Sequence, residues 1–128
     1  MAFGFLSPIL PVQEMLTTPH AEAAELPQPR EWTPDALESL AREKADKYGV
    51  SQETFVRVMK CESMNFEHNG QSFIEANGPN GREDSWGVVQ IHLPSHKVTK
   101  EQALDPEWAL EWAAKQFSEG NASMWSCY

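Results

Sequence analysis

Residues 55–63 form an amphipathic helical pattern that carries a carboxylic acid on its apolar face. Phe55, Val58 and Met59 recur at helical spacing, and Glu62 follows Val58 by four residues and Met59 by three. The pattern therefore puts Glu62 on the inward face, near the helix end. Because burial disfavours a charged carboxylate, we expect the pKa of Glu62 to be raised. Such an acid can act as a general acid, whereas a glutamate at a helix end is more often solvated or paired with a basic side chain.

Cap residues divide most of the chain into helices. Ser, Thr and Asp at an N-cap accept hydrogen bonds from the first turn, proline fits the first helical position, and glycine ends a helix. These signals predict two longer helices, a central polar stretch, a short helix and a last longer helix. The two longer helices are expected from Thr33-Pro34 to Gly49 and from Ser51 to Glu62 or Ser63. A capping box at Thr99 and Gln102 begins the short helix, and the last helix is expected from Asp105-Pro106 to Gly120.

The central stretch, residues 64–86, is rich in Asn, Gly and charge, and its Asn-Gly pairs are strong turn signals. A small β-hairpin or an irregular loop fits there. Residues 88–91 then form a short apolar segment that Pro94 stops. We therefore expect a mainly α domain of the α+β kind over residues 31–128, with a short β-hairpin or loop between the helices.

Length and charge limit the possible functions. The 128 residues are enough for one domain with its own core, and no apolar run is long enough to span a membrane. The net charge of −9 argues against a nucleic-acid partner, which would require a basic surface. Residues 1–30 hold five of the nine prolines, so we expect an extended Pro-rich tail or the remnant of an export signal.

The two cysteines, Cys61 and Cys127, fit one disulfide formed in an oxidising compartment. Closing a loop of this span would stabilise the fold by roughly 4 kcal/mol in the chain-entropy model. Two buried free thiols are the alternative.

Other side chains are weaker candidates for a metal site or a sugar-binding site. His92 and His96 have a metal-binding spacing on a helix, but Pro94 lies between them, so we expect no metal site. Trp108 and Trp112 are at helical spacing, which is more typical of core residues than of sugar platforms.

Two motifs, Cys61-Glu62-Ser63 and Gly87-Val88-Val89-Gln90-Ile91, together resemble the lysozyme-like superfamily, and soluble lytic transglycosylases in particular. In those enzymes a helix ends in Glu-Ser, and a Gly-Leu-Met-Gln-Ile type segment follows. The similarity covers about residues 50–117. It implies a small lysozyme-like α+β fold, with the glycan strand of peptidoglycan as the substrate.

The resemblance also implies roles for single residues. Glu62 would be the catalytic acid, and Ser63 would support it by hydrogen bonding. Gln90 would line the cleft, where Gly87 would allow close backbone approach. Trp86, in a loop beside the site, is a candidate for stacking on a sugar.

The end of the chain departs from the transglycosylase pattern. Those enzymes usually carry an Ala-Tyr-Asn motif on a later helix, and this motif is missing here. Tyr128 is the candidate to take the place of that tyrosine. A bond between Cys61 and Cys127 would bring this end of the chain beside Glu62.

A second carboxylate is also displaced. Animal lysozymes share a related segment with an aspartate two residues before its glycine, where this chain has Ser85. Asp84 lies one residue further away, which in a strand sends its side chain to the opposite face. Asp84 remains a candidate substrate-binding residue if a bulge turns it back.

The reaction implied by the resemblance is transglycosylation, in which one glutamate acts as acid and then as base. A lysozyme-type hydrolase is one alternative, and a non-catalytic glycan-binding or structural module is another. The acidic charge and the missing tyrosine motif favour the module, whereas the presence of Glu62, Ser63 and Gln90 together argues against it. We expect a monomer without a cofactor, located outside the cell, in the periplasm or in the cell envelope.

Overall fold

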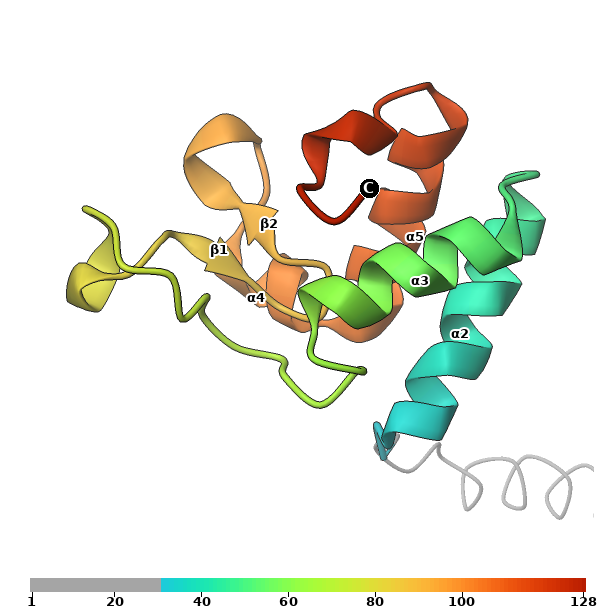
Figure 1. The fold of residues 1–128 in the computed structure, drawn as a ribbon, viewed down its shortest axis with the longest axis horizontal. Coiled ribbons are helices and arrows are strands. Elements are labelled where there is room, and N and C mark those ends of the chain that lie inside the picture. Colours follow the sequence, from blue (N-terminus) through green and yellow to red (C-terminus); the bar gives the residue numbers. More distant parts are fainter. Residues whose placement is uncertain (1–30) are drawn as a thin grey trace, which may run out of the picture. The chain divides into compact units, whose positions relative to one another are not determined.

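A computed structural model describes residues 31–128, and the expectations for residues 1–30 lie outside this part of the chain (Figure 1). The described residues form a mainly helical domain with one small antiparallel sheet, so the predicted fold class is confirmed. The elements are α2 (Pro34–Lys47), α3 (Gln52–Glu62), β1 (Ser85–Trp86), β2 (Ile91–His92), α4 (Lys100–Leu104) and α5 (Pro106–Ser118), with short 3-10 turns at Pro79–Gly81, Leu93–Ser95 and Ala122–Met124.

The first two helices begin at the predicted caps. The Thr33 hydroxyl accepts a hydrogen bond from the backbone N–H of Ala36 at 3.1 Å, and the Ser51 hydroxyl accepts one from Thr54 at 3.2 Å. Gly49 follows α2 with a φ of 69°, a conformation that glycine adopts without a steric penalty. These local bonds explain why the helix starts can be read from the sequence.

The last two helices also follow their caps. Thr99 and Gln102 form the full capping box, with both reciprocal hydrogen bonds at 3.0 Å. The Asp105 carboxylate then accepts a hydrogen bond from the N–H of Glu107 at 3.1 Å, which starts α5 directly after α4.

The hairpin lies later in the chain than expected. Residues 64–84 contain isolated bridges and one 3-10 turn, whereas β1 pairs with β2 so that Ser85 faces His92. Residues 87–90 form the turn between the strands, and Gly87 and Gln90 both have positive φ, at 86° and 57°. The apolar segment predicted from residues 88–91 is therefore mostly a buried turn.

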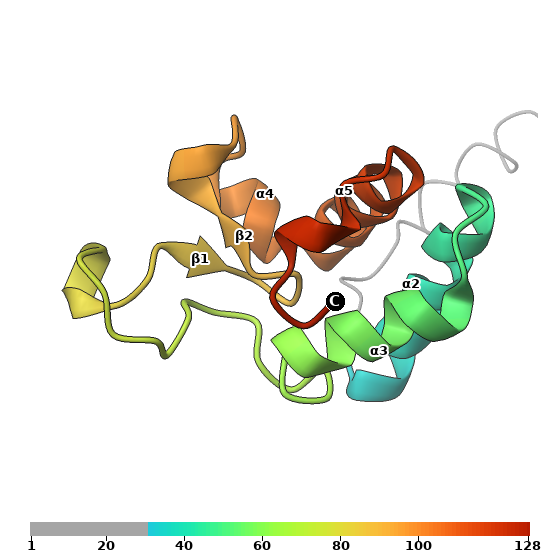
Figure 2. The same ribbon diagram turned by 45° about the horizontal axis from the view of Figure 1, so that its top comes forward.

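The core forms around α2, α3 and α5, which lie close together (Figures 1 and 2). The turn between the strands adds the buried side chains of Val88 and Val89 to this core. Trp108 and Trp112 are half-buried and pack against this core, as their helical spacing predicted. After α5 the chain turns back toward the end of α3 (Figure 2). The largest fully buried side chains are Phe55, Met59, Ile91, Leu110, Val58, Val88 and Val89.

An ion cluster around Glu111 ties α5 to α2. Lys44 and Lys47 donate to the two carboxylate oxygens of Glu111 at 2.8 and 2.7 Å, and the Tyr48 hydroxyl donates at 2.7 Å. The Lys44 side chain is only 8% exposed and also pairs with Glu107 at 3.1 Å. The hydrogen bond from Lys44, followed by those from Lys47 and Tyr48, lowers the pKa of Glu111 to about 2.

This cluster predicts a loss of stability in acid. The pKa of Glu111 is about 2 in the folded chain against an ordinary 4.5, so its contribution is complete above pH 4.5 and is lost as the pH falls toward 2. We expect Glu111→Gln to lower the free energy of unfolding by about 1–2 kcal/mol at pH 7 and by much less at pH 2. Urea titrations at both pH values measure this difference. Exposed Glu43 offers the matched control, and equal effects of Glu43→Gln and Glu111→Gln would contradict the prediction.

Candidate functional site

Glu62, the last residue of α3, borders a cleft of about 520 Å³. The cleft walls come from the end of α3, the loop at residues 64–74, the hairpin and the segment after α5. These parts are far apart in the sequence, so the site exists only in the folded chain.

The Glu62 carboxyl group is half-buried and has one hydrogen bond to the backbone: its Oε2 accepts from the N–H of Cys127 at 3.2 Å. Burial raises the pKa of Glu62, the hydrogen bond from Cys127 opposes this, and the nearby charge of Glu83 adds to the rise. The predicted direction of the shift is thus confirmed. A carboxyl group with a raised pKa keeps its proton to higher pH, as a general acid requires.

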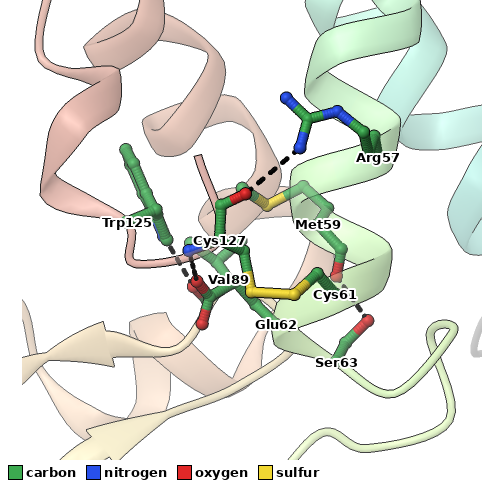
Figure 3. Close-up of a disulfide and its surroundings, with 8 residues drawn as sticks. All are labelled: Arg57, Met59, Cys61, Glu62, Ser63, Val89, Trp125 and Cys127. Atoms are coloured by element: carbon green, nitrogen blue, oxygen red, sulfur yellow. Dashed lines mark hydrogen bonds between the residues drawn. A yellow bond between two sulfur atoms is a disulfide. The ribbon is translucent and has the colours of Figure 1, made fainter.

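The predicted disulfide is also confirmed. Cys61 and Cys127 are bonded, with an S–S distance of 2.05 Å and their Cα atoms 6.0 Å apart (Figure 3). Because Cys61 directly precedes Glu62, the bond brings the end of the chain beside the carboxylate, as expected. Two further hydrogen bonds hold this segment: Arg57 donates to the Cys127 carbonyl at 3.2 Å, and the Trp125 indole donates to the Val89 carbonyl at 2.8 Å.

Gln90 lines the cleft, in agreement with its predicted position. Its side-chain amide donates to the carbonyls of Gly87 and Gly70, at 2.7 and 3.1 Å. These bonds close the turn between β1 and β2 and join it to the loop before the hairpin. Gln90 therefore fixes the orientation of one cleft wall.

Ser63 is placed differently from the prediction. Its hydroxyl donates to the Met59 carbonyl at 2.7 Å and accepts from the N–H of Phe66 at 2.8 Å. The side chain is fully buried and does not line the cleft. Ser63 thus shapes the chain as it leaves α3, because it satisfies backbone groups at the helix end, and the prediction that it supports the Glu62 carboxyl is wrong.

Asp84 and Trp86 interact with each other outside the cleft. The Trp86 indole donates to the Asp84 carboxylate at 2.6 Å, and the Lys100 ammonium lies 4.5 Å from the Trp86 ring centroid. Glu83 and Ser85 line the cleft instead. The side chain of Asp84 thus lies away from the cleft side that Ser85 lines, as the alternation of side chains along extended backbone predicts. Asp84 and Trp86 therefore do not line the cleft beside Glu62, and their role in substrate binding stays a prediction.

Tyr128 also lies outside the cleft. Its side chain is 58% exposed, and its ring packs edge-on against Phe117 with the ring centroids 6.0 Å apart. The disulfide positions the backbone of the preceding residue, Cys127, beside Glu62, whereas the tyrosine ring turns toward α5. The structure therefore does not bring the Tyr128 ring to Glu62, and the suggestion that it takes the place of the family tyrosine stays a prediction.

An apolar rim that was not predicted from the sequence borders the cleft. We define the apolar rim as Met64, Phe73, Ile74 and Met124, whose exposures lie between 43% and 63% and which all line the cleft. Large exposed apolar side chains gathered at one site mark a binding surface. The available signal was the Phe73-Ile74 pair within an otherwise polar stretch.

Among the described residues that line the cleft there is no lysine or arginine. The described part of the chain also holds no group of three or more His, Cys, Asp or Glu side chains placed to bind a metal ion. None of its helices within residues 31–128 is long and apolar enough to cross a membrane.

Comparisons of the chain with protein-family models, with curated proteins and with solved structures found no match.

Proposed function

We propose that this protein cleaves the β-1,4 glycan strand of peptidoglycan as a lytic transglycosylase, with Glu62 as the acid and then the base. The observation that carries the proposal is a half-buried carboxyl group, its pKa raised by burial, at the edge of an open cleft with polar walls and an apolar rim. The resemblance of the motifs around Glu62 and Gln90 to soluble lytic transglycosylases supplies the substrate class.

In the proposed reaction, protonated Glu62 gives its proton to the glycosidic oxygen while the bond from that oxygen to C1 breaks. The resulting carboxylate takes the proton of the 6-hydroxyl group on the same sugar. The oxygen of that hydroxyl bonds to C1, which leaves an anhydro sugar at the new chain end. Glu62 is protonated again, and no water is consumed.

The cleft walls suit a polysaccharide. The ring of Phe73 and the side chain of Ile74 offer apolar surface for the C–H face of a sugar ring. Polar groups of Ser72, Ser85 and Gln90 lie in the same cleft, where they would bond sugar hydroxyl or acetamido groups. This combination of a few polar groups with apolar contact is typical of sites that bind small or polymeric ligands.

The proposed role sets the direction of the pH dependence. Cleavage needs the protonated form of Glu62, so the rate should be highest below the pKa of Glu62 and should fall as the pH rises through it. Because burial raises this pKa, the active range extends further toward neutral pH than for an exposed glutamate.

A lysozyme-type hydrolase is the second candidate. Glu83 lines the same cleft, and its charge is close enough to raise the pKa of Glu62. A second carboxylate of this kind could activate water or form a glycosyl intermediate. In that case Glu83, rather than Asp84, would be the second carboxylate of the hydrolase.

The products distinguish the two reactions. We expect mass spectrometry of digested peptidoglycan to show 1,6-anhydromuramyl ends and no gain of water. Products with only reducing ends would establish the hydrolase. Binding to purified walls without any cleavage would replace both with the non-catalytic glycan-binding module.

The disulfide supports a location in an oxidising compartment, which we propose is extracellular, periplasmic or within the cell envelope.

A further inference from the structure

We propose that the C-terminal segment, residues 125–127, positions the Glu62 carboxylate for catalysis, and that the Cys61–Cys127 disulfide makes this positioning depend on redox state. The inference rests on the proposed function of Glu62 and adds a means of regulating the same site.

Cys127 is joined to the catalytic helix in two ways at once. Its sulfur is bonded to Cys61, the residue directly before Glu62, and its backbone N–H donates to the Glu62 carboxylate at 3.2 Å. The covalent bond limits how far this N–H can move from Glu62. A hydrogen bond to an ionised group is stronger than one between neutral groups, so it can hold the carboxylate in one orientation (Figure 3).

The segment has other anchors, chiefly at Trp125, which is buried in the core with ring contacts to Trp112 and Phe117. Arg57 holds the Cys127 carbonyl, and the Trp125 indole holds the Val89 carbonyl. The Arg57 bond is exposed, whereas the Trp125 bond is buried. Without the disulfide, no covalent bond would hold the N–H of Cys127 beside Glu62. It would be held by the exposed Arg57 bond on its own residue, by Trp125 two residues earlier, and by the hydrogen bond from the N–H of Tyr128 to the Trp125 carbonyl at 3.0 Å.

Opposing influences act on the Glu62 carboxyl group. Burial and the charge of Glu83 favour the protonated acid, whereas the N–H of Cys127 favours the carboxylate. The other titratable or charged groups nearby are His68 and His92, which line the cleft, and Arg57, which reaches the Cys127 carbonyl. Loss of the hydrogen bond should raise the pKa of Glu62 further and leave its carboxylate free to rotate.

The redox step requires a dithiol reductant. The reductant supplies two electrons and two protons, the S–S bond breaks, and two S–H groups form while the reductant closes into its own disulfide. Cys61 is exposed, so a small dithiol can reach its sulfur without unfolding of the core.

The test is a carboxyl NMR titration of the full chain with ¹³C-labelled glutamate, in the oxidised form and after reduction with dithiothreitol. A Glu62→Gln variant assigns the signal. We expect the midpoint for Glu62 to move to higher pH on reduction, the alkaline limb of the activity profile to follow it, and the maximal rate to fall by roughly tenfold. An unchanged midpoint in a reduced chain that stays folded by circular dichroism would overturn the proposal.

A second measurement needs no reduction, so it tests the positioning role of Cys127 even if the reduced chain unfolds. In the oxidised protein, the amide signal of Cys127 should titrate with the same midpoint as the Glu62 carboxyl. The amide of Ala36, which donates to a hydroxyl, is the control. A Cys127 amide signal that does not shift as Glu62 titrates would refute the positioning role. The two NMR titrations use the protein without substrate, so their results stand even if the proposed glycan cleavage fails, whereas the activity profile tests both proposals together.

Discussion

Glu62→Gln is expected to lower the rate of glycan cleavage by roughly 10³- to 10⁴-fold and to leave the fold intact. Glutamine has the same shape but carries no proton that it can donate to a glycosidic oxygen. Its side-chain carbonyl can still accept the hydrogen bond from the N–H of Cys127, so the C-terminal segment should stay in place. Because the substitution also removes the burial of an ionisable group, we expect unchanged or slightly higher stability at neutral pH.

Release of soluble fragments from purified peptidoglycan measures this effect. Two further variants make the result specific to the role of Glu62. Exposed Glu67→Gln removes a charge from the loop after α3 and should retain the wild-type rate. Glu83→Gln should retain most of the rate of a transglycosylase but should abolish that of a two-carboxylate hydrolase. A Glu62→Gln variant as active as the wild type would remove Glu62 from the mechanism.

Features set by short-range chemistry could be predicted from the sequence. The helix starts at Thr33, Ser51 and Thr99 depend on hydrogen bonds within the first turn, so local residue types are sufficient to locate them. The pKa shift of Glu62 followed from the helical period, which places this residue on the face that packs inward. The disulfide followed from there being two cysteines.

Other features of the site could not be predicted in this way. Ser63 satisfies backbone groups of Met59 and Phe66, and a motif that places it next to Glu62 does not reveal this. The ring of Tyr128 packs on α5, although the disulfide brings the adjoining backbone beside Glu62. The apolar rim is assembled from two segments whose proximity only the fold creates.

The hairpin shows both cases. The alternation of side chains along extended backbone correctly separated Asp84 from the side of Ser85. The expected hairpin or irregular loop over residues 64–86 did not fix where the strands lie. Residues 87–90 form the turn between them, and an apolar run does not distinguish a buried turn from a buried strand. Positive φ at Gly87 and Gln90 makes this turn possible, and the non-glycine Gln90 at 57° gave no signal in the sequence.

Gly87→Ala is expected to be strongly destabilising, by about 3–5 kcal/mol, from the sum of backbone strain and overpacking. Gly87 has a φ of 86°, and a Cβ atom there would come within 1.9 Å of the Ala103 carbonyl oxygen in α4. The contact is with backbone, so α4 or the turn must move. Asn69 links the same two parts, because its side chain accepts from the N–H of Val88 and donates to the Leu104 carbonyl, both at 3.1 Å.

Gly81→Ala separates the two causes of this loss. Gly81 has a similar φ of 72°, but a Cβ atom there would have no neighbour within 4 Å. Gly81→Ala should therefore lower the free energy of unfolding by only about 1 kcal/mol, which is the strain of an alanine in the left-handed conformation. Urea unfolding of both variants at 25 °C measures the difference. If both substitutions lowered the free energy of unfolding equally, the close approach of Gly87 to α4 would add nothing to the loss. The positive φ alone would then explain why glycine is required in the cleft wall that also holds Gln90.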